Sequence, residues 1–211
     1  MTRSLRRFLR EPDGPQAPPQ ERCELCATPV AAEHPHLVEP AERRLLCACT
    51  PCGVLFSEPG LRYRRVPDRY LYDTGFVLSD TQWDELQVPV GMAFFLVNSI
   101  RRAVVACYPS PAGATESELS LAAWADGVGT SALAALLEPD AEALLVRRGD
   151  AGRGGRPEAL LVPIDACYRL VGLVRMHWKG FDGGVAAWAA IDAFFAELRG
   201  RARDVRNEAP C

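Results

Sequence analysis

The C-terminal two thirds of the chain contains continuous apolar runs and segments in which apolar residues recur at the spacing of a helix. "MAFFLVNS" (92–99) and "AVVACYPS" (103–110) are apolar runs that predict a pair of strands. "EALLVRR" (142–148) and "EALLVPI" (158–164) predict a second pair around the loop "GDAGRGGRP". Beyond them, two stripes at three- and four-residue spacing predict two helices that "KGFDGG" separates, with Asp165 as the N-cap of the first. The stripes are Cys167, Leu170, Val171, Val174 and Trp178, then Val185, Trp188, Ile191, Phe195 and Leu198.

Shorter elements precede these. "LRYRRV" (61–66) alternates and predicts a strand, and "SDTQWDEL" (79–86) predicts a short helix capped by its Ser or Asp. A capping box of Thr115 and Glu118 opens "TESELSLAAWADGV", and "TSALAALL" (130–137) predicts a further helix. This mixed order favours an α+β fold over a doubly wound parallel sheet.

The N-terminal part differs in composition, with basic, proline-rich and cysteine-rich segments in succession. "MTRSLRRFLR" predicts a short basic helix, and the prolines of "EPDGPQAPPQ" predict an extended lead-in. We therefore expect four parts: a lead-in (1–20), a cysteine-rich metal-binding module (21–58), an α+β domain (61–203) and a tail (204–211).

Composition and charge exclude several classes of protein. The net charge of −3 gives no general attraction to nucleic acid, and 48% hydrophobic residues is ordinary for a globular protein. No apolar run approaches the roughly 18 residues that a membrane span needs. The N-terminus lacks the apolar stretch of a secretory signal, which predicts a cytoplasmic chain.

Five of the eight cysteines lie between residues 23 and 52. Cys23 and Cys26 form one C-x-x-C, and Cys49 and Cys52 form another after a spacer of 22 residues. Two such turns can offer four thiolates to one tetrahedral ion, as in zinc ribbons and rubredoxin-like modules. We expect Zn²⁺ on these four sulfurs, with iron as the alternative; disulfides are the competing interpretation.

Three further side chains of this stretch exceed the needs of one site: His34, His36 and Cys47. They are bystanders, or one of them replaces a cysteine of the quartet. "HLVE" and "RRLLCA" predict a hairpin beneath the metal. Gly53 after the second pair suits a turn with positive φ, whereas Ala27 after the first pair suits it less.

Other candidates are weaker. The arginines of "RYRRVPDRYLY" could follow a nucleic-acid backbone, or simply form a solvated strand face. His177 fits a packed histidine, and Cys107 and Cys167 fit small buried side chains. No nucleophile, base and orienting group can be assembled, so the sequence does not indicate an enzyme.

Several motifs together resemble a family of bacterial proteins. They are the first C-x-x-C, "HPHLV", "LLCACTPC", "YPSPAGATES" and "PIDACYRLVG…WKGFDGG" with the following "FF", between about residues 21 and 200. The family resembles accessory proteins encoded beside nickel–iron uptake hydrogenases. The resemblance implies a role in hydrogenase assembly or maturation, with a hydrogenase subunit or maturation factor as partner, and no catalytic residue. Three functions stay open: a metal-binding accessory protein, a rubredoxin-like electron carrier, and a zinc-ribbon nucleic-acid binder through Arg62, Arg64 and Arg65.

Overall fold

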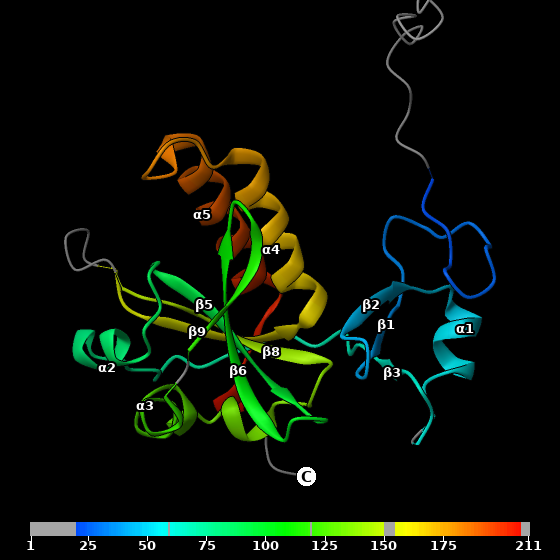
Figure 1. Cartoon of the computed structure of the whole chain (residues 1–211), viewed down its shortest axis with the longest axis horizontal. Coiled ribbons are helices and arrows are strands. Elements are labelled where there is room, and N and C mark those ends of the chain that lie inside the picture. Colours follow the sequence, from blue (N-terminus) through cyan, green and yellow to red (C-terminus); the bar gives the residue numbers. More distant parts are fainter. Residues whose placement is uncertain (1–19, 59, 119, 150–154, 208–211) are drawn as a thin grey trace, which may run out of the picture.

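The computed structural model describes residues 20–58, 60–118, 120–149 and 155–207. The expected basic helix at 1–10, nearly all of the proline-rich lead-in and the middle of the 149–157 loop lie outside these residues. The described chain contains a seven-stranded sheet with helices on both faces and a separate three-stranded sheet near the N-terminus (Figure 1).

The larger sheet has the strand order β10-β4-β9-β8-β5-β6-β7. Its neighbours are antiparallel except for the β10–β4 pair. Both strand pairs expected from the apolar runs are present, as the β5–β6 and β8–β9 pairs. The strands are β4 (Leu71–Tyr72), β5 (Met92–Asn98), β6 (Ala103–Ser110), β7 (Gly113–Ser117), β8 (Glu142–Arg147), β9 (Glu158–Pro163) and β10 (Arg203–Asp204).

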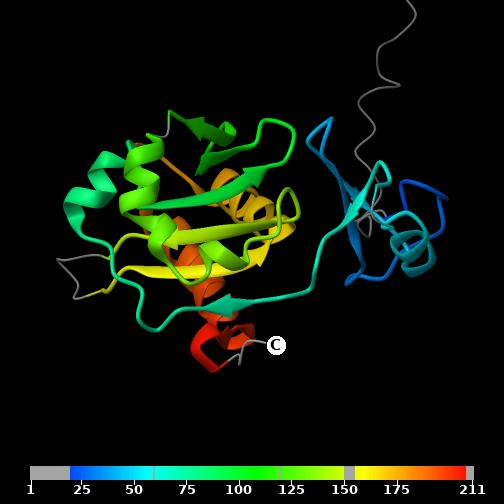
Figure 2. The ribbon, with the colours of Figure 1, turned by 90° about the horizontal axis from the view of Figure 1, so that it is seen from below.

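Helices cover this sheet on both sides (Figures 1 and 2). One face carries α4 (Ile164–His177) and α5 (Gly184–Arg201); the other carries α2 (Asp80–Glu85), α3 (Leu121–Asp126) and the 3₁₀ turns η2 (Val128–Thr130) and η3 (Ala134–Leu136). Successive residues of a strand point to opposite faces, so Leu145 packs with α4 and α5 while Leu144 packs on the other side. A sheet buried on both faces explains why the strand sequences are continuous apolar runs. The α+β fold is confirmed.

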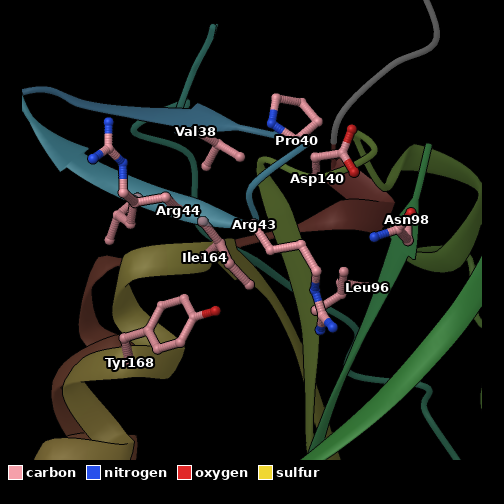
Figure 3. Close-up of a pocket in the computed structure, with 10 residues that line it drawn as sticks. Val38, Pro40, Arg43, Arg44, Leu96, Asn98, Asp140, Ile164 and Tyr168 are labelled. Atoms are coloured by element: carbon pink, nitrogen blue, oxygen red, sulfur yellow. The ribbon is translucent and has the colours of Figure 1, made fainter. Parts of the chain in front are cut away.

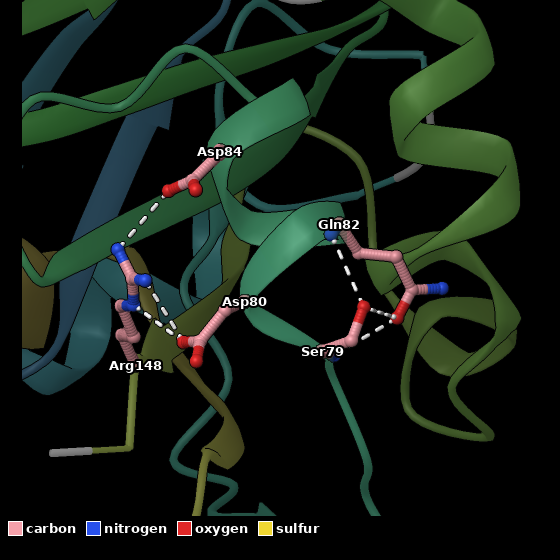
Figure 4. A network of polar contacts seen from close by, with 5 residues as sticks. All are labelled: Ser79, Asp80, Gln82, Asp84 and Arg148. Atoms are coloured by element: carbon pink, nitrogen blue, oxygen red, sulfur yellow. Dashed lines mark hydrogen bonds and ion pairs between the residues drawn. The ribbon is translucent and has the colours of Figure 1, made fainter. Parts of the chain in front are cut away.

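The start of α2 was predicted correctly. Ser79 caps it, and Ser79 and Gln82 form a reciprocal capping box (Figure 4). Arg148, directly after β8, donates to Asp80 at 2.9 Å and to Asp84 at 3.1 Å. These contacts fix the short helix to the neighbouring strand.

Three local expectations were wrong. Thr115 lies in β7 opposite Tyr108, and α3 begins later, capped by Ser120. The expected helix at 130–137 forms only the turn η3. Asp165 lies in the first turn of α4, because the strand runs on to Pro163, which takes the cap position.

The N-terminal sheet has the strand order β2-β1-β3. The helix α1, about one and a half turns long, follows β2 in the chain. The elements of this region are β1 (His36–Glu39), β2 (Arg44–Cys47), α1 (Thr50–Leu55) and β3 (Arg64–Arg65). The expected hairpin is therefore present, with His36 opposite Cys47. One side of this sheet has a small core of its own, whereas Val38 and Val66 join the core of the larger body. At the other end of the chain, η5 (Val205–Asn207) follows β10.

Candidate metal centre

The first C-x-x-C is a tight turn that brings Cys23 and Cys26 to one side of the chain. The N–H of Cys23 donates to the Thr28 carbonyl, and the N–H of Ala27 donates to the Cys23 carbonyl, both at 2.8 Å. Ala27 has φ 61°, in the left-handed region that favours glycine. The turn therefore closes at an alanine, which costs it some stability.

The second C-x-x-C leads into α1. Cys49 occupies the N-cap position and Cys52 the first turn, and the Gly53 N–H donates to the Cys49 carbonyl at 2.8 Å. Gly53 itself is helical, so the expectation of a positive φ there was wrong. A Cβ at this position would lie 3.2 Å from Cβ of Pro35. The glycine thus allows the helix to approach the start of β1.

The two turns lie side by side because the first is hydrogen-bonded to the end of β2 and the second follows β2 directly in the chain. The N–H of Glu24, in the first turn, donates to the Cys47 carbonyl at 2.9 Å. The N–H of Cys47 donates back to Oε2 of Glu24 at 2.7 Å. Since Cys47 lies two residues before Cys49, these bonds fix the first turn beside the second.

The four sulfurs converge. The Sγ atoms of Cys23, Cys26, Cys49 and Cys52 all lie within 4.8 Å of one another, and those of Cys26 and Cys49 are 3.6 Å apart. A tetrahedron with Zn–S bonds of about 2.3 Å has edges of about 3.8 Å. These four residues are free cysteines, not disulfides. The donor set therefore fits one tetrahedral metal ion such as zinc.

The surroundings of the sulfurs differ. Burial acts to raise the pKa of Cys23, but backbone N–H groups of Cys49, Leu25 and Cys26 outweigh it and lower the pKa to about 6. Burial, reinforced by the neighbouring thiols, raises the pKa of Cys52 to about 12. The protein alone thus stabilises a thiolate at Cys23, and a cation would be needed to bring Cys52 into the same state.

His34, His36 and Cys47 lie apart from the quartet as a group of their own, with one donor atom of each within 4.8 Å of the others. Asp165 lies beside this group, with its Oδ2 3.5 Å from Nδ1 of His36. It was not identified from the sequence as a residue of this site. Asp165 and His36 are far apart in the chain, and the position of Asp165 at the start of a helix pointed only to a cap. Burial lowers the pKa of His36.

Most arginines of "RYRRVPDRYLY" form ion pairs within the protein. Three of them form ion pairs with carboxylates that are almost completely buried: Arg62 with Glu39, Arg64 with Asp140 and Arg69 with Glu142. Arg65 is exposed. Charges neutralised in this way are poorly placed to follow a phosphate backbone, which favours the structural interpretation of the run.

A small cavity separates the β1–β2 hairpin from α4 and the larger sheet (Figure 3). Arg43, Leu96 and Tyr168 are among its lining residues, and its volume is about 30 Å³. That is room for little more than a water molecule. It is therefore a packing gap at the contact between hairpin and body.

The two cysteines of the larger body fit a structural role. Cys107 and Cys167 are buried, and burial raises the pKa of both thiols, to about 11 for Cys107. Both face the core shared by α4 and the sheet. Neither thiol is placed to act as a nucleophile.

Comparisons with known proteins place the chain in one family. The model of the Family of unknown function (DUF5947) matches residues 22–202, and the chain belongs to that family. No curated protein and no solved structure matches it. Of the described helices, none has both the length and the apolar character that a bilayer crossing requires.

Proposed function

We propose that this DUF5947 protein is a metal-binding accessory protein that acts through contacts with another protein. Cys23, Cys26, Cys49 and Cys52 hold one zinc ion in the module at 21–58, and the α+β body at 61–203 presents the docking surface. The observation that supports this proposal is the convergence of four free thiols from two distant turns.

A structural role for the ion follows from its ligands and from the size of the module. Four thiolates fill a tetrahedral zinc and leave no open position for a substrate. The core beneath them is small: its buried members are Cys23, Val30, Leu37, Ala48 and Cys52. Burial of so few side chains does not offset the entropy of ordering the knuckles, so the ion supplies the missing free energy.

The finer part of the proposal concerns the partner. The motifs shared with accessory proteins encoded beside nickel–iron uptake hydrogenases direct it to a cytoplasmic hydrogenase subunit or maturation factor. Affinity-tagged full-length protein, expressed in a host with an uptake hydrogenase, is expected to co-purify with one of these proteins. Recovery of the tagged chain without any of them would end the hydrogenase part of the proposal and leave the metal site untouched.

Metal content tests the site itself. We expect elemental analysis of the full chain to find zinc and Cys26→Ser to lose the quartet-bound ion, while the matched control Cys107→Ser keeps it. Loss of the ion should also speed hydrogen exchange in β1 and β2 while β8 and β9 stay protected. Wild-type protein without metal, with its cysteines oxidised to disulfides, would refute the proposal.

The same four sulfurs could hold iron, and Cys26 is exposed to solvent, as an electron-transfer site requires. A visible spectrum separates the two functions, because ferric thiolate is red and zinc thiolate is colourless. A protein that stays colourless on exposure to air after anaerobic, iron-replete expression would exclude the rubredoxin-like carrier.

A further inference from the structure

The β1–β2 hairpin carries a second set of metal-binding side chains on one of its faces. His36 lies directly opposite Cys47 in the antiparallel register, and directly opposed side chains share a face. His34 precedes His36 by two residues, and their ring centroids are 4.7 Å apart. One donor atom from each of the three residues lies within 4.8 Å of the other two.

Both imidazole rings are already oriented through one nitrogen. Nδ1 of His34 lies 2.9 Å from the Ala31 carbonyl, and Nδ1 of His36 faces Oδ2 of Asp165 at 3.5 Å. Histidines that bind metal through Nε2 characteristically donate from Nδ1 to a carbonyl or a carboxylate in this way. Each ring therefore has Nε2 left over for another partner.

That partner is missing for the most buried ring. The side chain of His34 is 6% exposed, and its Nε2 is buried without a hydrogen-bond partner among the described residues. A buried polar atom left unsatisfied is unfavourable, and such atoms are uncommon in folded proteins. Coordination of a cation by this nitrogen, together with His36 and Cys47, would satisfy it.

We propose that His34 and His36, through Nε2, and Cys47, through Sγ, bind a second divalent metal ion of the late first-row series, with zinc as the leading candidate. Imidazole and thiolate are the donors that such ions prefer. Three protein ligands are also the number found in zinc sites that keep one position open. This site is distinct from the four-sulfur site, since its three residues form a separate group.

Two of the three proposed ligands line a cavity. His34 and His36 line an open cavity of about 640 Å³ between the hairpin and the first turns of α4. Asp165 lines it as well, and its Oδ1 is buried without a hydrogen-bond partner in the described part of the chain. An exchangeable ligand on the metal would have room on this side of the hairpin.

The net charge of the metal with its three ligands suits a small anion as the exchangeable ligand. A divalent ion with two neutral imidazoles and one thiolate keeps a net charge of +1. Arg65 lines the same cavity and forms no ion pair with a described residue, whereas Arg201 pairs with Asp68 and Arg169 pairs with Glu197. The acidic lining residues are Glu21, Glu33, Asp68 and Asp165. They lead us to expect a compact anion that reaches the metal, not a large polyanion that fills the cavity.

Metal stoichiometry of the full chain tests the proposal. After dialysis against a small excess of zinc, we expect two equivalents per chain in the wild type and one in His36→Ala and in Cys47→Ser. The matched controls His177→Ala and Cys107→Ser should keep two. One equivalent in the wild type, or two in both site variants, would overturn the second site.

Cobalt substitution assigns each ion to its ligands even if a variant is less stable. The His36→Ala protein should keep the intense thiolate-to-cobalt charge transfer of the four-sulfur site and lose a weaker spectrum with one thiolate. Cys26→Ser should do the reverse, so failure of one site is distinguishable from failure of the other. Azide added to the wild-type cobalt protein should shift only the weaker spectrum; a spectrum that azide leaves unchanged would refute the open position.

Discussion

The ion pair of Arg69 and Glu142 predicts a large loss of stability when only one partner is removed. Glu142, at the start of β8, is 0% exposed. Arg69 binds it with two hydrogen bonds, from Nε at 2.9 Å and from Nη2 at 2.6 Å, and the Glu138 N–H donates a third at 3.0 Å. Arg69 lies in the segment that connects the N-terminal sheet to β4, so the pair also positions that connection.

Arg69→Met would leave a buried carboxylate with one backbone donor. Breaking a buried pair in this way typically costs 3–5 kcal/mol. The Arg69 side chain is 35% exposed, so water can reach part of the vacated space, and we expect the lower end, about 3 kcal/mol. Glu142→Gln in the same chain removes the unpaired charge and keeps an acceptor for Glu138, so the double variant should recover at least about 1 kcal/mol of that loss.

Urea unfolding measures both the loss of stability in Arg69→Met and its recovery in the double variant. The four tryptophans all lie after residue 80, so their fluorescence reports on the larger body. A loss below about 0.5 kcal/mol, the level of a surface pair, would show that the reasoning from burial is wrong.

Three smaller effects follow from other contacts. Ala27→Gly should raise the free energy of unfolding of the metal-bound module by about 0.5–1 kcal/mol, since glycine tolerates the left-handed conformation of this turn; an unchanged or lower urea midpoint of the module would contradict it. Ser120→Ala should cost about 1 kcal/mol in the same assay, because its Oγ accepts from the Ala123 N–H at the start of α3, and a neutral result would mean that the cap adds nothing. The hydrogen bond from Arg43 lowers the pKa of Glu116, so the stability of this exposed pair is complete above the unfolded carboxyl's pKa of about 4.3 and is lost as the pH falls through the lower folded value. It should amount to less than about 1 kcal/mol, and Glu116→Gln should flatten that part of the pH profile; identical profiles would refute the assignment.

The strong local signals in the sequence predicted the parts of the structure that depend on them. C-x-x-C spacing was enough to find the four sulfurs, because two short turns determine where each pair points. The apolar runs identified β5, β6, β8 and β9, and the buried stripe of α4 includes Cys167, Leu170, Val171 and Val174. In each case, the pattern and the burial arise within a few consecutive residues.

The errors came where distant residues decide the outcome. Thr115 has the chemistry of a helix cap, yet pairing with β6 places it in a strand. Val185 was assigned to the buried stripe of α5, but it lies in the first turn of that helix and is 89% exposed. Asp165 meets His36 only through the docking of α4 against the hairpin, and no local pattern records that contact.

The parallel pairing of β10 with β4 has a practical consequence for anyone shortening the chain. The Arg203 N–H donates to the Tyr70 carbonyl at 3.0 Å, so two residues near the C-terminus cover the outer edge of the seven-stranded sheet. Truncation at residue 202 would uncover the backbone groups of β4 and present them to other molecules as a template for strand addition. Such a fragment is expected to aggregate although it retains α4, α5 and every cysteine of the metal sites.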